Sequence, residues 1–334
     1  MITPEPIGRP ARRPPPPLDP ELEAALAASG ERTLSTGITA DSLERARATL
    51  LASVPSLEQL AARGVFDVEE HRAPSQAGAV PLLVLRPRSV ASARPILYFT
   101  HGGGLMMGNS RYGLGPVLRL AAELGAVVVS VDYRLAPEHR FPAGLDDAYA
   151  GLRWTTSHAV ELSGAPRQIV LVGASAGGNL AAALAMLARD RREVEVLGQL
   201  LMYPMLDDRN DSLSAHQMTG RGVWDRVSNE TGWASWLGDS RHGRISPYAA
   251  PARSQDLSGL PPAFLDVGSA ETFRDEVVAY AERIWAAGGA AELHVWAGAV
   301  HGFDLLAPKA AVSRDAHAAR LRWLGRLLRS ESSG

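Results

Sequence analysis

The strongest constraint on the fold of this chain is an alternation of short, almost continuously apolar runs with longer helical segments. Two of the runs, AVVVSV at 126–131 and QIVLVG at 168–173, carry very few polar side chains. A strand with one solvated face alternates apolar and polar residues, whereas a strand buried on both faces does not. The pattern therefore predicts one doubly wound α/β domain with a mostly parallel sheet from about residue 64 to the end.

The alternation also predicts where the elements lie. Strands are expected at 65–71, 80–86, 95–99, 126–131, 168–172, 199–203, 263–267 and 292–296. Helices are expected at 41–63, 111–123, 142–157, 176–189, 273–287 and 310–329. Pro55 should break or kink the first helix, and the proline- and arginine-rich residues 7–20 should not form one.

One long stretch interrupts this rhythm. Between Pro204 and Pro262 the sequence shows no clear strand. Loops of this length are typical of functional lids or disordered inserts. The stretch contains Trp224, Trp233 and Trp236, the last two at helical spacing, which favours an ordered lid that packs on the rest of the protein.

Composition excludes several kinds of chemistry. The chain has no cysteine and one lysine, Lys309, so disulfides, thiolate metal sites and cysteine nucleophiles are excluded, and Schiff-base chemistry is disfavoured. The chain has 34 basic and 36 acidic residues, and the basic residues do not cluster in a run. No nucleic-acid partner is therefore expected. No apolar stretch is long enough to span a membrane and residues 1–20 lack the apolar core of a secretory signal, so the expected location is cytoplasmic.

The motif with the clearest chemical meaning is Gly173-Ala174-Ser175-Ala176-Gly177. A G-x-S-x-G pattern alone is weak, but this one follows a predicted strand and opens a predicted helix, as in a nucleophile elbow. Such a turn forces the serine into a sparsely populated backbone conformation, and the two flanking glycines avoid collisions. The alternative is a glycine-rich turn that only caps a structural helix.

A second motif, His101-Gly102-Gly103-Gly104, follows the predicted strand at 95–99. Three glycines let backbone N–H groups approach a ligand closely, as an oxyanion hole requires. A phosphate-binding loop is the alternative, but neither a helix start nor a lysine follows in the P-loop pattern.

A third motif, His301-Gly302-Phe303, follows the last predicted strand, where a base could reach a nucleophile at the same edge of the sheet. An ordinary surface histidine is the alternative. His101 is the other candidate base, although it opens the glycine loop and is expected to support its shape. His294 lies within a strand and is expected to be structural.

With these motifs in order, the chain resembles the hormone-sensitive-lipase-like carboxylesterases (bacterial esterase family IV) of the α/β-hydrolase superfamily. The resemblance runs from about residue 95 to 303. It rests on HGGG at 101–104, DYRLAPEHRFPAGLDDA at 132–148, GASAGGNLA at 173–181, LPPAFLDVGSAETFRDE at 260–276 and HGF at 301–303. It implies an α/β-hydrolase fold, with an eight-stranded sheet under a helical cap. The cap would be built from the N-terminal segment 1–63 and from an insert at 204–262, which lies within a catalytic domain spanning 64–334.

The resemblance also implies site residues. Ser175 would be the nucleophile and His301 the base, with Gly103, Gly104 and Ala176 as oxyanion donors. The acid departs from the family pattern, because Glu271 stands where an aspartate is usual. Hydrolase triads of this fold accept either acid.

Asp275, four residues beyond Glu271, is the alternative acid, though it is expected to serve as a first-turn helix residue or ion-pair partner. Asp132, Arg134 and Glu138 form a further charged group, which the resemblance implies is structural, a loop held by ion pairs behind the glycine turn.

The predicted reaction is hydrolysis of short to medium acyl esters through an acyl-enzyme, with no cofactor and no metal. Leu105, Met106, Met107 and Trp224 are expected to line the apolar substrate pocket, or alternatively only to pack the cap on the sheet. An amidase, lactonase or deacetylase would use the same triad, and a binding protein on the same fold is a further alternative. An exposed strand at 292–296 could pair two copies into a homodimer.

Overall fold

The eight predicted strands are all present and form one sheet. The computed structural model describes residues 14–30, 37–62, 64–88, 95–163, 165 and 168–331. Its strand order is β1-β2-β4-β3-β5-β6-β7-β8, parallel from β4 onward, with β2 antiparallel to both β1 and β4. The bounds are β1 Phe66–Ser75, β2 Gly78–Pro87, β3 Ile96–Thr100, β4 Val127–Val131, β5 Ile169–Ala174, β6 Gly198–Met202, β7 Ala263–Gly268 and β8 Ala291–Trp296.

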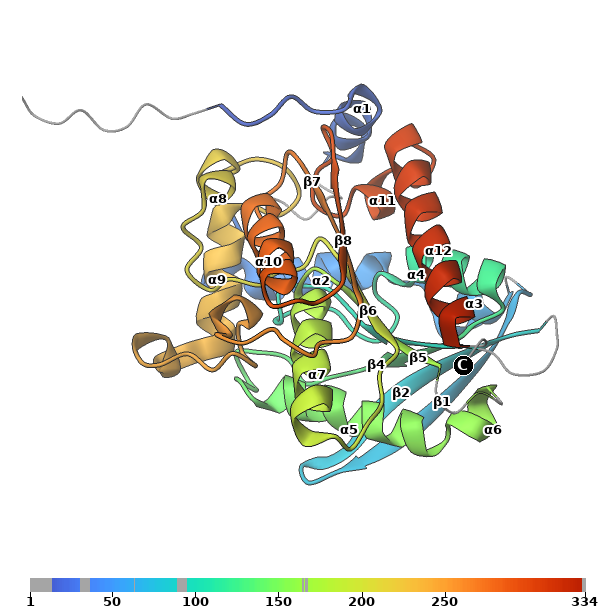
Figure 1. The fold of residues 1–334 in the computed structure, drawn as a ribbon. Coiled ribbons are helices and arrows are strands. Elements are labelled where there is room, and N and C mark those ends of the chain that lie inside the picture. The colour runs from blue at the N-terminus through green and yellow to red at the C-terminus, as the bar shows by residue number, and fades with distance from the viewer. Residues whose placement is uncertain are drawn as a thin grey trace, which may run out of the picture.

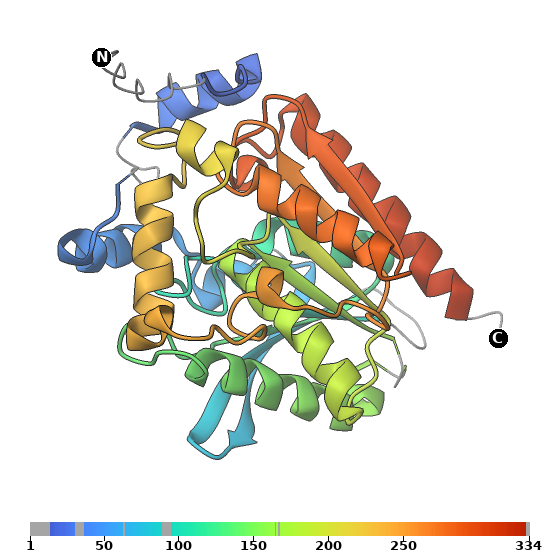
Figure 2. The same cartoon turned by 60° about the vertical axis from the view of Figure 1, so that its left-hand side comes forward.

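Helices cover both faces of this sheet, as the fold class requires (Figures 1 and 2). One face carries α5 (Ala143–Ser157), α7 (Ala176–Arg191) and α10 (Arg274–Ala286), and the other carries α4 (Leu114–Leu124) and α12 (Ala311–Glu331). Every residue of β3 to β7 is buried, which explains their apolar sequences. All five of these helices agree with the predicted segments, with α4 starting three residues late.

The described part of the N-terminal segment forms three α-helices and one short 3₁₀ turn at Ala40–Ser42. The predicted helix at 41–63 is split into α2 (Leu43–Ser53) and α3 (Leu57–Ala62), and Pro55 lies in the break, as expected. The additional helix α1 (Pro20–Ser29) was not predicted. Asp19 caps it by accepting from two backbone N–H groups, and its Leu22 is fully buried. Of the residues 7–20, the first seven lie outside the described part.

The insert at 204–262 contains no strand and packs as ordered helices. It holds α8 (Leu213–Gln217), α9 (Arg226–Leu237) and two short 3₁₀ turns at Gly238–His242 and Pro251–Arg253. Trp233 and Trp236 on α9 are fully buried, which confirms the prediction of an ordered insert.

The insert is bonded directly to the N-terminal part. The Ile38 N–H donates to Ser228 Oγ over 3.0 Å, and the Ile38 carbonyl accepts from Thr231 Oγ1 over 2.7 Å, both on α9. The two segments therefore form one layer despite their distance in sequence.

Two shorter helices, α6 (Ala159–Ser163) and α11 (Phe303–Leu306), complete the described structure. Across the ranges that the structure describes, no helix has both the length and the apolar character needed to cross a membrane. Because the parallel strands end at one edge of the sheet, the loops that follow β3, β5, β7 and β8 meet there. These are the loops that carry the sequence motifs.

Candidate active site

Ser175 lies on a sharp turn between β5 and α7. Its backbone is strained, with φ 57° and ψ −121°, which non-glycine residues seldom adopt. The turn is possible because its neighbours are glycines. A Cβ on Gly173 would lie 2.3 Å from the Gly177 carbonyl oxygen, and a Cβ on Gly177 would lie 1.9 Å from that of Thr100. The strand–turn–helix context expected for this motif is therefore present, and the serine stands exposed to the cavity described below.

The structure brings Ser175, His301 and Glu271 together in one hydrogen-bonded chain. Ser175 Oγ lies 2.9 Å from His301 Nε2, and His301 Nδ1 lies 3.0 Å from Glu271 Oε1. The second carboxylate oxygen, Oε2, accepts from the Gly268 N–H over 3.0 Å. A carboxylate only accepts, so His301 must carry its proton on Nδ1, which leaves Nε2 free to take the proton of the serine hydroxyl.

All three side chains are shielded from solvent, and aromatic rings hold the imidazole. His301 is 7 % exposed, with Tyr203 and Phe273 packed edge-on at centroid distances of 5.0 Å and 5.1 Å. Trp224 lies 6.5 Å away at a tilt. Such packing restricts the ring to the orientation in which its two hydrogen bonds form.

The glycine motif forms a tight turn against the serine. Gly103 and Gly104 have φ of 113° and 63°, and the Met107 N–H donates to the Gly103 carbonyl over 2.9 Å. A Cβ on Gly102 would lie 3.3 Å from the Ser175 Cβ, so this turn and the elbow are in close contact. The amides of Gly103 and Gly104, with that of Ala176 at the start of α7, are the expected oxyanion donors. The first N–H groups of any helix lack an intrahelical partner.

His101 does not belong to this hydrogen-bonded chain. It is fully buried, stacks on Tyr133 at a centroid distance of 4.2 Å, and its Nδ1 lies 2.8 Å from the Gly102 carbonyl oxygen. Burial lowers the pKa of His101 to about 4, so the ring is neutral at pH 7. It supports the glycine turn, as the sequence suggested, and does not face Ser175.

Asp275 is bonded elsewhere. Its carboxylate accepts from the Ser214 N–H over 2.8 Å and from Arg274 Nε over 2.8 Å, so it is an ion-pair partner at the start of α10. The next residue, Glu276, is buried and accepts from the Leu206 N–H over 2.7 Å. Desolvation raises the pKa of Glu276 well above its usual value.

The charged block at 132–148 is held by ion pairs, as expected. Arg134 forms a two-pronged bond with Asp147, at 2.7 Å and 2.9 Å. Glu138 pairs with Arg47 of α2, whose guanidinium lowers the pKa of Glu138 to about 2. Arg47 also donates to the carbonyl of Met106 over 2.8 Å, so it joins the N-terminal part to the loop after the glycines.

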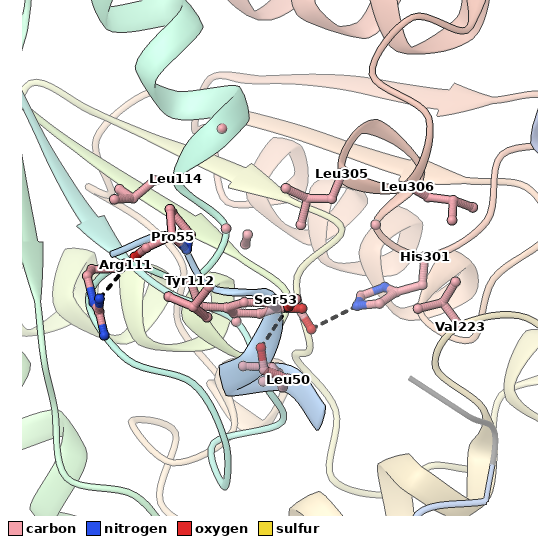
Figure 3. A pocket seen from close by; sticks show the side chains of 18 of the residues that line it. Leu50, Ser53, Pro55, Arg111, Tyr112, Leu114, Val223, His301, Leu305 and Leu306 are labelled. Carbon is pink, nitrogen blue, oxygen red and sulfur yellow. Dashed lines mark hydrogen bonds between the residues drawn. The ribbon is translucent and has the colours of Figure 1, made fainter. Parts of the chain in front are cut away.

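A cavity of about 540 Å³ opens onto Ser175 and His301 (Figure 3). Its walls come from the N-terminal helices, the glycine loop and the segment after it, the turn at Ser175, Tyr203 after β6, the insert, and the loop at His301. The lining residues are Ser29, Thr49, Leu50, Ser53, Val54, Pro55, Leu60, Gly102, Gly103, Arg111, Tyr112, Gly113, Leu114, Gly115, Leu118, Ala174, Ser175, Tyr203, Val223, Trp224, His301, Gly302, Leu305 and Leu306.

Of the four residues expected to line the pocket, only Trp224 does so. Leu105, Met106 and Met107 are fully buried and do not border the cavity. The left-handed backbone at Gly103, Gly104 and Leu105 coils the chain, and Met106 packs near Ser235 of α9 instead. This is the alternative considered for them, in which they pack the insert on the sheet.

Sequence reasoning missed most of the cavity wall. Thr49, Leu50 and Ser53 on α2 recur at a helical spacing, but that pattern does not say against which element the helix packs. Arg111 and Tyr112 lie just beyond the glycine loop, and this closeness in sequence was the one available signal. Within the described ranges, no group of three or more His, Asp or Glu side chains could hold a metal ion.

Comparison with known proteins adds independent information. A family model described as alpha/beta hydrolase fold matches residues 96–305. Carboxylesterase NlhH of Mycobacterium tuberculosis is 40% identical over 243 residues, which cover 70% of this chain and 74% of that protein. The solved structure "Bacterial Heroin Esterase" has a TM-score of 0.85 and 37% identity, covering 93% of this chain and 98% of that one. Gibberellin receptor GID1C of Arabidopsis thaliana is 30% identical over 241 residues, 70% of each chain.

Proposed function

Since this chain belongs to the alpha/beta hydrolase fold family, we propose that Ser175, His301 and Glu271 are the catalytic triad of its carboxylesterase activity. The chain is a serine ester hydrolase of the hormone-sensitive-lipase-like group, as its esterase relatives indicate. The observation that carries the residue assignment is the continuous hydrogen-bonded path from Ser175 Oγ through both nitrogens of His301 to Glu271.

The reaction proceeds in two steps. His301 Nε2 takes the hydroxyl proton while Ser175 Oγ attacks the ester carbonyl carbon, and the amides of Gly103, Gly104 and Ala176 bind the oxyanion. His301 returns the proton to the leaving alcohol, which leaves an acyl-serine. Water then attacks this acyl group with His301 again as base, and the acid product departs.

Each supporting residue has a part in these steps. Glu271 stays ionised, holds the proton on Nδ1 and stabilises the imidazolium that forms in each transition state. Burial of the triad strengthens these electrostatic interactions, because little water competes with them. Loss of one oxyanion donor typically lowers kcat by about 10²- to 10³-fold.

The substrates are esters with short to medium acyl groups. The largely apolar cavity has room for a chain of that size beside the reacting carbonyl, since ligand pockets of about 300–1,000 Å³ accept small organic molecules. The segments up to residue 63 and at 204–262 act as the cap. Leu50 and Val54 from the first and Val223 and Trp224 from the second close the cavity over Ser175.

The test of the triad is covalent labelling together with kinetics. A fluorophosphonate should form one adduct on Ser175, located by mass spectrometry after digestion, and Ser175→Ala should abolish it. The same variant should lower kcat for p-nitrophenyl butyrate by about 10⁶-fold while the melting temperature stays near that of the wild type. An adduct on another residue, or a folded Ser175→Ala variant with near-normal rates, would contradict the assignment.

Amidase, lactonase or deacetylase activity would use the same triad, and a panel of nitrophenyl esters, anilides and lactones separates these reactions. A ligand-binding role, as the name of the gibberellin receptor relative describes for that protein, requires no nucleophile. Labelling of Ser175 by the fluorophosphonate would oppose that role here. The homodimer and the cytoplasmic location remain predictions, testable by analytical ultracentrifugation and by cell fractionation.

A further inference from the structure

A single permanently charged side chain borders the cavity. Apart from the titratable His301, the cavity wall within the described chain contains one charged residue, Arg111. Its other polar side chains carry hydroxyls, apart from Trp224, whose indole N–H donates to Asn229 Oδ1. The hydroxyls of Ser29 and Ser53 already donate to carbonyl oxygens of their own helices. An ester with an uncharged chain gains nothing from a guanidinium at this position. The chemistry of the cavity therefore raises the question of what Arg111 binds.

The guanidinium of Arg111 is only partly used by the protein. Its Nη1 donates to the Pro55 carbonyl over 3.0 Å, which is one of the five N–H donors that an arginine offers. Across the described ranges no carboxylate lies within 4 Å of it, unlike Arg47 or Arg134, which each have a bonded acid. The acid whose pKa its charge affects is Asp132, and there burial outweighs Arg111 and raises the pKa. The charge of Arg111 is thus compensated only at a distance.

The position of Arg111 relates it to the reacting atoms. Figure 3 shows Arg111 and His301 on opposite sides of the cavity, with Tyr112 between them and Leu114 and Leu305 above. The Tyr112 phenol is neutral, because burial raises its pKa to about 12. A ligand that spans the cavity from Ser175 would therefore cross an uncharged, largely apolar region and meet a positive charge at the far side.

We propose that Arg111 binds a terminal carboxylate of the substrate, so that the site accepts half-esters of dicarboxylic acids or hydroxy acids that are acylated on the hydroxyl and keep a free carboxylate. This inference rests on the proposed function, because it requires the ester carbonyl to lie at Ser175. Planar guanidinium groups pair with carboxylates through two parallel hydrogen bonds, and such charge-assisted bonds are about twice as strong as neutral ones. Pairing also removes the cost of a partly buried cation without a counter-ion.

The experiment compares a charged ester with an uncharged one of similar length. The substrates are p-nitrophenyl hydrogen glutarate and p-nitrophenyl hexanoate, and the proteins are the wild type, Arg111→Met and Arg111→Gln. Glutamine keeps a polar N–H donor on a shorter side chain and removes the charge, whereas methionine removes both. Arg88→Met is the control, since Arg88 forms an exposed ion pair with Asp67 outside the cavity.

Both Arg111 variants should lose about 10- to 100-fold in kcat/KM for the glutarate half-ester, which is what a hydrogen bond to a charged group contributes. The hexanoate should be hydrolysed at the wild-type rate or faster, and free glutarate should inhibit the wild type more strongly than the variants. Arg88→Met should leave all three values unchanged. Esters with the carboxylate on the alcohol side, tested in parallel, show which half of the substrate reaches Arg111.

An unchanged ratio of the two kcat/KM values in both variants would overturn the inference. An equal loss on both substrates would overturn it too, and would make the Pro55 contact the role of Arg111. Melting temperatures of the variants exclude misfolding as the cause of any loss. If the wild type hydrolyses hexanoate normally and Ser175 is labelled, failure concerns Arg111 alone. If the wild type hydrolyses neither ester and Ser175 is not labelled, the proposed function itself fails.

Discussion

The carboxylate of Glu271 offers the sharpest test of the proposed triad, through the substitution Glu271→Gln. Both oxygens of Glu271 accept: Oε1 faces His301 Nδ1 at 3.0 Å, and Oε2 accepts from the Gly268 N–H over 3.0 Å. A glutamine has the same shape but one oxygen and one NH₂ group. It can therefore satisfy only one of these two donors, whichever way the amide is turned.

Either orientation of the amide harms the site. With the oxygen toward Gly268, the NH₂ group donates to Nδ1, so the imidazole proton moves to Nε2. The protonated Nε2 can then no longer accept the hydrogen bond of the Ser175 hydroxyl. With the oxygen toward His301, two donors face each other at Gly268, and the negative charge that stabilises the imidazolium is still lost. Loss of a triad carboxylate with intact geometry lowers kcat by about 10⁴-fold, which corresponds to about 5 kcal/mol of transition-state stabilisation.

The assay is the hydrolysis of p-nitrophenyl butyrate at pH 7, with kcat and KM measured separately. We expect kcat to fall by about 10⁴-fold, KM to change little and the variant to remain folded by circular dichroism. Asp275→Asn is the matched control, since Asp275 accepts from Ser214 and Arg274 and not from His301. A Glu271→Gln variant within tenfold of the wild type would refute the reasoning, as would an equal loss in Asp275→Asn.

Three further substitutions test the surroundings of the site. Gly177→Ala would place a Cβ 1.9 Å from a backbone oxygen that cannot move away, so urea unfolding should show a loss of at least about 3 kcal/mol, whereas Gly115→Ala, with open space around it, should be neutral. His101→Gln should make the free energy of unfolding less sensitive to acid. Because the pKa of His101 is lowered in the folded protein, protonation favours the unfolded chain, and the free energy of unfolding of the wild type should fall by up to about 3 kcal/mol as pH drops from 6.5 to 4. Equal pH profiles of the two proteins would contradict this. Arg47→Ala should lower kcat more than it raises KM, because Arg47 holds the loop after the oxyanion glycines, and Glu138→Gln should show a smaller effect of the same kind in Michaelis kinetics.

The strands and the residues of the proposed triad were predictable because their sequence signals are local. A strand buried on both faces is mostly apolar, and β3 to β7 are buried along their whole length and carry few polar side chains. The parallel arrangement then brings the loops after β5, β7 and β8 to one edge of the sheet. Ser175, Glu271 and His301 follow those strands in sequence, so their meeting required no knowledge of the helices.

The helix α1 escaped prediction for the opposite reason. Its sequence, PELEAALAAS, has no wide apolar face, and Leu22 is its one buried residue. Contacts with distant parts of the chain stabilise it: the Asp19 N–H donates to the Gly298 carbonyl over 3.0 Å, and Glu21 accepts from the Ala311 N–H over 2.6 Å. Tertiary contacts of this kind leave no periodic pattern in the sequence.

The substrate pocket is built both from residues with a local sequence signal and from segments that only tertiary contacts bring together. Its chemistry was therefore the least predictable feature of the site. The residues after the glycine loop directly follow the expected oxyanion donors in sequence, yet positive φ values turn Met106 and Met107 away from the cavity and leave Arg111 and Tyr112 on its wall. The opposite wall comes from α2. The ion pair between Arg47 and Glu138 and the hydrogen bonds between Ile38 and α9 hold this part of the chain against the cavity. The residues of the proposed triad are therefore readable at strand ends, whereas the pocket wall depends on how separate segments dock. The role proposed for the charge of Arg111 likewise depends on this docking, which makes Arg111 part of the same cavity wall as Ser175 and His301.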